Sequence, residues 1–136
     1  MRRFVRFVVL AIALGLPATA AAQQWKPIGR TTRDGSEMFV KASSIRRGGD
    51  TVTALILTRF ATPTWNPVTK DSLRALTTLV TFDCGREKVV VKESVYYVDF
   101  DRNRVSERRK PKVPGYQAVF GAAYPIAYAS LCAKPK

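Results

Sequence analysis

The chain contains no histidine among its 136 residues. This absence excludes a Ser-His-Asp triad, a Cys-His pair and an imidazole metal ligand, so a nucleophile would need lysine or a carboxylate as its base. Carboxylates are also few, and only Asp99 and Asp101 lie close together in the sequence, beside several arginines. Other carboxylates could meet only through the fold. We therefore expect a protein that is not an enzyme, with no catalytic residues, no metal site and no cofactor.

Cysteine is nearly absent, with Cys84 and Cys132 as the two occurrences. In an oxidising compartment such an isolated pair is most simply a structural disulfide. Closing the long loop between these positions would stabilise a small domain by about 4 kcal/mol. A reactive or metal-binding pair is the alternative. Because the spacing is not C-x-x-C and histidine is missing, we predict the disulfide.

The first 22 residues have the pattern of a secretory signal peptide. Arginines form a positive start, residues 7–16 form an apolar run, and small residues fill positions 18–22. A membrane anchor is the alternative, but Gly15 and Pro17 interrupt the uncharged stretch 7–24, and a spanning helix needs about 20 mostly apolar residues. We expect cleavage after Ala22, where no cysteine is available for lipid attachment.

Residues 23–136 are long enough for one domain and too short for two. The whole chain carries a net charge of +13, and losing three leading arginines and no carboxylate leaves +10. This charge favours anionic partners, which outside the cytoplasm are envelope polymers or host and extracellular proteins, and we expect no nucleic acid. Solubility alone is the other explanation. The expected location is the periplasm, the cell surface or the extracellular space, with no transmembrane segment after cleavage.

Alternating hydrophobic patterns predict strands over most of the remaining chain. The strand patterns are clearest at 51–60, 73–84 and 88–99, with shorter ones at 25–28, 37–41 and 116–120. The segment 51–60 is apolar on both faces, which is typical of a central strand. On 88–99 the residues expected to share one face are Val89, Val91, Val95 and Tyr97. Turns or loops are expected at 46–50, 61–72, 101–103 and 108–112.

The alanine-rich segment 124–133 predicts a short helix with Pro125 in its first turn and Ile126 against the sheet. Cys132 lies near the end of this helix. The predicted fold class is therefore α+β and mostly β. It consists of a single antiparallel sheet of about five to six strands, with a short C-terminal helix tethered by the disulfide.

The order of several short motifs is informative. Trp25 follows the signal peptide, a later strand ends in Phe82-Asp83-Cys84, and Cys132 lies in the terminal helix; Phe39-Val40, Ser44-Ile45-Arg46-Arg47 and Gly49 lie between. This order resembles the surface-adhesin protein E-like family of exported Gram-negative envelope proteins. The chain differs from the family pattern at Lys41, where an acidic residue is frequent, and in lacking the lipid-attachment cysteine. The resemblance implies a disulfide-tied sheet and helix, and a role in binding host matrix and serum proteins.

We therefore interpret residues 23–136 as a single surface-adhesin E-like domain, a non-enzymatic binding or adhesion module for an anionic or protein partner. The alternative is a small periplasmic inhibitor or accessory protein of a cell-wall enzyme, which would present one protruding loop. The candidate residues for an anionic ligand are the densest basic run: Arg102, Arg104, Arg108, Arg109, Lys110 and Lys112. The planar fork of arginine suits carboxylates, sulfates and phosphates. A solvated hairpin tip is the other interpretation of this run.

For four further residues the sequence predicts a specific place in the structure. Trp65, in a proline-flanked segment, is expected to cap the sheet, with an exposed binding contact as the alternative. Trp25 is expected in the core. The pair Arg46-Arg47 is a second basic spot, for which a plain charged turn is the favoured interpretation.

Overall fold

The computed structural model describes residues 24–119, 121 and 123–133. The predicted signal peptide lies outside the described residues. The strands are β1 (Trp25–Arg30), β2 (Glu37–Lys41), β3 (Arg46–Gly48), β4 (Thr51–Asn66), β5 (Asp71–Asp83), β6 (Lys88–Asp99), β7 (Arg104–Arg109) and β8 (Gln117–Ala118). The helices are the short 3-10 helix η2 (Ala42–Ser44) and α1 (Tyr124–Cys132).

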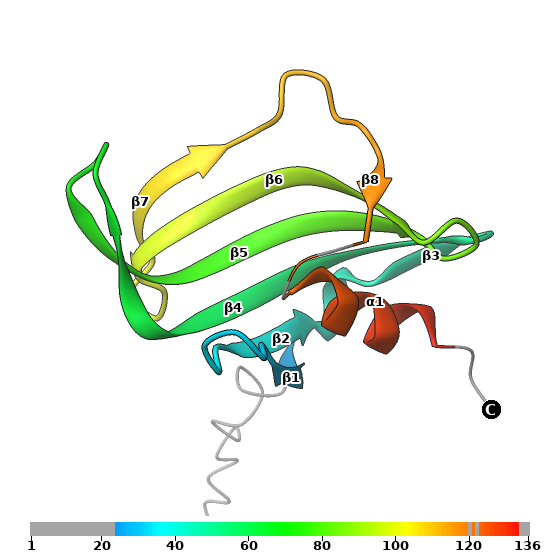
Figure 1. Ribbon diagram of the computed structural model, residues 1–136, viewed down its shortest axis with the longest axis horizontal. Coiled ribbons are helices and arrows are strands. Elements are labelled where there is room, and N and C mark those ends of the chain that lie inside the picture. Colours follow the sequence, from blue (N-terminus) through cyan, green and yellow to red (C-terminus); the bar gives the residue numbers. More distant parts are fainter. Residues whose placement is uncertain (1–23, 120, 122, 134–136) are drawn as a thin grey trace, which may run out of the picture.

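The strands form one antiparallel sheet in the order β1-β2-β4-β5-β6-β7 (Figure 1). Two short strands extend this path, because β3 pairs with β4 and β8 pairs with β6. The single sheet and the C-terminal helix confirm the predicted fold class. The described part of the sheet has eight strands rather than five or six, because β3 and β7 occupy segments in which we expected turns and loops.

The main core lies between α1 and one face of the sheet (Figure 1). Val52, Ala54 and Ile56 of β4 are at most 4% exposed and share a cluster with Ala127 and Leu131 of α1. The strand that begins at residue 51 is central in the sheet, between β2 and β5, as its two apolar faces predict. A helix of nine residues is not stable alone in water, so α1 depends on this packing. The cluster is completed by Met38, Val40, Val80, Phe82 and Val89.

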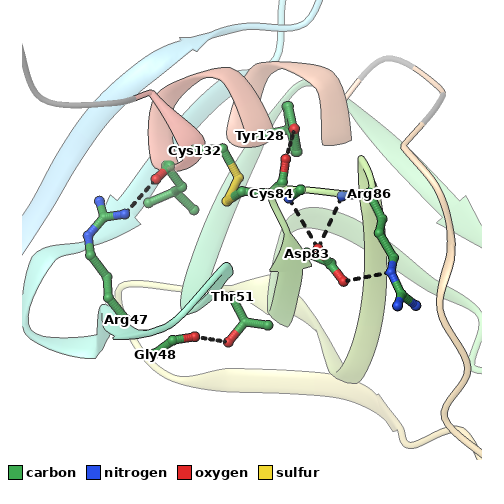
Figure 2. Close-up of a disulfide and its surroundings, with 10 residues drawn as sticks. Arg47, Gly48, Thr51, Asp83, Cys84, Arg86, Tyr128 and Cys132 are labelled. Atoms are coloured by element: carbon green, nitrogen blue, oxygen red, sulfur yellow. Dashed lines mark hydrogen bonds and ion pairs between the residues drawn. A yellow bond between two sulfur atoms is a disulfide. The ribbon is translucent and has the colours of Figure 1, made fainter.

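Three contacts besides packing hold the C-terminal half of α1 (Figure 2). Cys84, directly after β5, forms the predicted disulfide with Cys132, and their Cα atoms are 5.5 Å apart. The Tyr128 hydroxyl donates to the Cys84 carbonyl oxygen at 2.7 Å. Arg47 donates from Nη1 to the Leu131 carbonyl oxygen at 2.7 Å. Arg47 therefore places a positive charge at the C-terminal end of the helix dipole, instead of lying in a plain turn.

The approach of β1 to α1 requires glycine at position 29. Gly29 has a φ of +149°, and a Cβ atom built there would lie 3.0 Å from the Cγ2 atom of Ile126. Ile126 is consequently half-buried against β1. The helix residues that are fully buried are Ala127 and Leu131.

A β-bulge in β6 changes which residues share a face. Glu93 pairs with Leu79 but Val91 pairs with Val80, so Lys92 is left over. An extra residue reverses the alternation of side chains along a strand. Val91 therefore packs with the core beneath α1, whereas Val95 belongs to a second cluster on the opposite face. Our prediction that 89, 91, 95 and 97 share one face was wrong for this reason.

Three segments that we expected to be turns or loops are partly strands. The strand β4 extends to Asn66 and β5 begins at Asp71, so the expected loop 61–72 is mostly a hairpin, with an irregular register between Arg59 and Thr64. Residues 46–48 pair with β4 instead of forming a turn. Residues 108–109 pair with β6 and belong to β7. In each case a neighbouring strand supplies the hydrogen bonds, which local sequence does not reveal.

Candidate functional site

The basic segment, residues 102–112, runs along β7 at one edge of the sheet. Its members are exposed: Arg102 precedes β7, Arg104, Arg108 and Arg109 belong to it, and Lys110 and Lys112 follow it. The segment holds six cations and one carboxylate. The structure therefore keeps the predicted residues on one edge, although it does not gather them into a single cluster.

Two neighbouring arginines of the basic segment turn to opposite faces of the sheet, as successive strand residues do. Arg108 lies opposite Val95, and its Nη1 atom is 3.4 Å from Oε1 of Glu93. The guanidinium of Arg109 stacks on the ring of Tyr96, with 4.9 Å between its Cζ atom and the ring centroid. Tyr96 of β6 is thus in direct contact with the basic segment.

Glu107 organises this edge. Arg109 donates to it from Nε and Nη2, each at 2.9 Å, and Asn66 donates from Nδ2 at 3.0 Å. These hydrogen bonds, first that from Arg109 and then that from Asn66, hold the pKa of Glu107 below its ordinary value. The same contact with Glu107 raises the pKa of Arg109. The carboxylate therefore stays ionised and fixes both the arginine fork and the neighbouring hairpin.

The other cations of the segment are paired weakly with carboxylates or not at all among the described residues. Arg102 lies 3.8 Å from Oδ2 of Asp99 through its Nε atom, an exposed and weak pairing. Arg104, Lys110 and Lys112 make no ion pair with any described residue. These three side chains can meet an anionic group without first giving up a protein carboxylate.

The β4–β5 hairpin extends past the end of the sheet and then turns toward β7 (Figure 1). Asn66, which is 5% exposed, accepts from the N–H group of Val68 at 3.0 Å in the turn. Ser106 of β7 contacts the Thr69 hydroxyl at 2.8 Å and donates to Oδ2 of Asp71 at 2.7 Å. The hairpin is therefore fastened to β7 beside the basic segment.

Trp65 lies in this hairpin and is 61% exposed. The expectation that it caps the sheet is therefore wrong, because the hairpin carries it beyond the strands that it would cover. Trp25 is partly buried, and its ring meets that of Phe100 edge-on at 5.6 Å between centroids. It thus contributes to the second hydrophobic cluster rather than to the core under α1.

The face of the sheet opposite α1 carries a groove of about 440 Å³, which we call the open-face groove. Its floor follows the strand register, since Leu55 pairs with Leu79 and Thr77 pairs with Val95. One half of this face is closed by the second cluster, in which Leu57 is 1% exposed. Val95 and Tyr97 of that cluster also border the groove. The residues that line the groove are Lys41, Ser43, Ser44, Leu55, Thr77, Leu79, Glu93, Val95, Tyr97 and Arg108.

The sequence predicted Arg108 as a ligand-binding residue, but as part of the basic run and not of a groove, and it did not indicate Lys41 as a site residue. The signal that was present was the apolar second face of the strand at 51–60, which carries Leu55 and Leu57. That pattern predicts burial on both sides and gives no indication that α1 covers only one of them. The bulge at Lys92 brings Val95 to the groove, and no glycine or proline in the sequence indicates it.

No three His, Cys, Asp or Glu side chains among the described residues are arranged to hold a metal ion. In the same part of the chain, every buried side-chain nitrogen or oxygen has a hydrogen-bond partner. None of the helices that the structure describes is both long and apolar enough to cross a membrane.

These features define a small single-sheet protein whose covering helix is tied down by one disulfide. The sequence model of the family described as Surface-adhesin protein E matches residues 25–121, and the chain belongs to this family of adhesion-type surface proteins. No curated protein matches the chain.

The fold is that of solved structures of protein E from Haemophilus influenzae. One crystal form is 14% identical to this chain, with a TM-score of 0.55, and the alignment covers 93% of this chain and 96% of that one. Protein E from non-typeable Haemophilus influenzae is 13% identical, with a TM-score of 0.54 and coverage of 92% and 82%. At such low identity the likeness establishes the fold alone, and it leaves the partner of this chain open.

Proposed function

We propose that this protein is a non-enzymatic, exported binding module of the cell envelope, which attaches to an anionic polymer or an acidic protein surface through the basic segment. The observation that carries the proposal is the exposed edge formed by residues 102–112, in which Arg104, Lys110 and Lys112 have no carboxylate partner among the described residues. Membership of a surface-adhesin family supports the binding role and the location outside the cytoplasm.

Electrostatics favours this edge over the rest of the surface. A partner anion that meets an unpaired, solvated cation gains the attraction without displacing an existing ion pair. The excess of positive charge also attracts polyanions from a distance and speeds their association. Arg109 adds a positioned guanidinium, because Glu107 and the ring of Tyr96 hold it in place. Such an edge suits sulfated, phosphorylated or carboxylated chains.

The test compares two variants that lose the same charge. One replaces Arg104, Lys110 and Lys112 by glutamine, and the matched control replaces Lys26, Arg33 and Lys88, which are exposed elsewhere on the surface. Binding of each to lipopolysaccharide, peptidoglycan, a sulfated polysaccharide and a matrix protein is measured at low and at physiological ionic strength. We expect the first variant to bind its preferred partner about tenfold more weakly at physiological ionic strength, and the control to resemble the unmodified protein. Equal weakening of both would contradict the proposal and leave only a general effect of net charge.

A second candidate function is inhibition of a cell-wall enzyme, which one observation favours. The β4–β5 hairpin presents Trp65 at 61% exposure while hydrogen bonds from Asn66 and Ser106 hold the hairpin in place. A rigid loop with an exposed tryptophan costs little conformational entropy on binding. If this function is correct, the protein slows a peptidoglycan hydrolase and Trp65→Ala abolishes the effect, whereas the triple variant of the basic segment still inhibits.

A further inference from the structure

The open-face groove has an apolar floor that no described part of the chain covers. Leu55 of β4 and Leu79 of β5 pair directly and are partly accessible, while Val95 of β6, which pairs with Thr77 and is 6% exposed, lies diagonal to Leu79 and also lines the groove. On the opposite face, α1 covers the equivalent strands. Exposed apolar surface that is hollowed rather than flat marks a binding site more often than a structural accident.

One end of the groove carries a free positive charge. Lys41 is the last residue of β2, next to Val40, which pairs with Ile56 of β4. It makes no ion pair with any residue that the structure describes. The chain then leaves the sheet as η2, so Ser43 borders the same end of the groove.

The wall beside Lys41 is held rigidly by Ser44. Its hydroxyl donates to the Lys41 carbonyl oxygen at 2.6 Å and accepts from the N–H group of Leu55 at 2.9 Å. Neither β2 nor β3 pairs with β4 at Leu55, and the Ser44 hydroxyl supplies the hydrogen-bond acceptor that a neighbouring strand would otherwise provide there. Because the hydroxyl of Ser44 is engaged in this way, the side chains of this wall that can contact a ligand are those of Lys41 and Ser43.

The opposite side of the groove is nearly neutral. Arg108 and Glu93 border it and pair at 3.4 Å, so their charges offset each other. The net charge around the groove is therefore that of Lys41 alone. A ligand with one anionic group and a longer apolar body matches this distribution, whereas a polyanion would find one free cation and an apolar floor.

From this distribution we propose that the open-face groove binds one small amphiphilic anion, with its carboxylate at Lys41 and its hydrocarbon chain across Leu55, Leu79 and Val95. The volume of about 440 Å³ is within the range of sites for small molecules. The site is independent of the attachment proposed for the basic segment, because of the six cations there only Arg108 lines the groove, and Glu93 already pairs with it.

The probe is laurate, added to the purified protein below the concentration at which laurate forms micelles. Calorimetry measures affinity and stoichiometry, and ¹H–¹⁵N NMR locates the site. We expect one saturable site, with shifts at Lys41, Leu55 and Leu79. Lys41→Gln should weaken binding about fivefold and Leu79→Gln by more, while Lys88→Gln, an exposed control on β6, leaves it unchanged.

Each other outcome would overturn the proposal. Absence of saturation, or equal weakening by Lys41→Gln and Lys88→Gln, would reduce binding to adsorption on a basic protein. Shifts confined to residues 102–112 would move the anion to the basic segment. A dimer that Leu79→Gln dissociates would assign this face to a second copy of the chain. The triple glutamine variant of Arg104, Lys110 and Lys112 should keep its affinity for laurate, so this test can fail or succeed apart from the proposed function.

Discussion

Arg47 illustrates how far a single side chain can act from its place in the sequence. It belongs to the short strand β3, yet its guanidinium caps the carbonyl of Leu131, 84 residues later. The helix that it caps has no basic residue in its own last turn and no side-chain cap at its start. Sequence reasoning could not distinguish Arg47 from Arg46, because the difference arises only when α1 docks.

The first prediction concerns this cap. Arg47→Gln should lower the free energy of unfolding by about 1–2 kcal/mol, because a charged hydrogen bond and a favourable interaction with the helix dipole are lost together. Arg46→Gln is the matched control, since Arg46 donates only to the nearby carbonyl oxygens of Ser43 and Ile45. Urea denaturation of the three proteins measures the difference. Equal midpoints for Arg47→Gln and Arg46→Gln would show that the cap contributes nothing.

The second prediction concerns pH and Glu107. The hydrogen bonds from Arg109 and Asn66 hold the pKa of Glu107 in the folded protein below its ordinary value. Ionised Glu107 therefore stabilises the fold at pH values above its ordinary pKa, and this contribution disappears as the pH falls through the lowered folded value. We expect Glu107→Gln to be less stable than the unmodified protein near neutrality, with the gap in Tm closing in acid. Thermal melts from neutral pH to below pH 4 test this; a gap that stays constant would refute it.

At the scale of elements, strands with many β-branched residues were predicted closely. The strand predicted at 88–99 has those bounds, and the one at 37–41 does as well. The predictions failed where partners far along the chain decide the structure. The strand β4 continues to Asn66 despite Pro63, because the two arms of the hairpin pair with each other, and Pro67 lies in the turn between them. The bulge at Lys92 has no local marker, since neither glycine nor proline stands there.

The third prediction concerns the element that the disulfide holds. The variant with both Cys84→Ser and Cys132→Ser should lose about 4 kcal/mol of unfolding free energy, because the unfolded chain regains the entropy of an open loop. Hydrogen exchange should accelerate first in α1, whose remaining anchors are the bonds of Tyr128 and Arg47 and its packing. Reduction with a thiol should reproduce the effect. An unchanged Tm after reduction would mean that packing alone holds the helix.

At the scale of the whole molecule, composition predicted that the surface is strongly basic, but it did not predict where on that surface a ligand would bind. The net charge of +13 pointed to anionic partners, and the basic segment is indeed exposed along one edge. Arg108 and Arg109 lie on opposite faces of the sheet, and predicting this requires knowing that both belong to β7 and how β7 pairs with β6. The open-face groove could not be predicted from the sequence either, because it exists only where α1 leaves one face of the sheet uncovered.

The disulfide also determines how the molecule carries mechanical load. Tension applied between the two ends of the described chain enters at β1 and at the end of α1, and the covalent link from Cys132 to Cys84 passes it directly to the end of β5. The intervening stretch, with a sequence separation of 48, is bypassed, so on the order of 160 Å of extended chain cannot be drawn out. That shielded stretch contains β6, β7 and the basic segment. Under shear, the strands outside this loop, from β1 to β5, would unravel first, while the edge proposed to hold the partner carries no tension along its own chain.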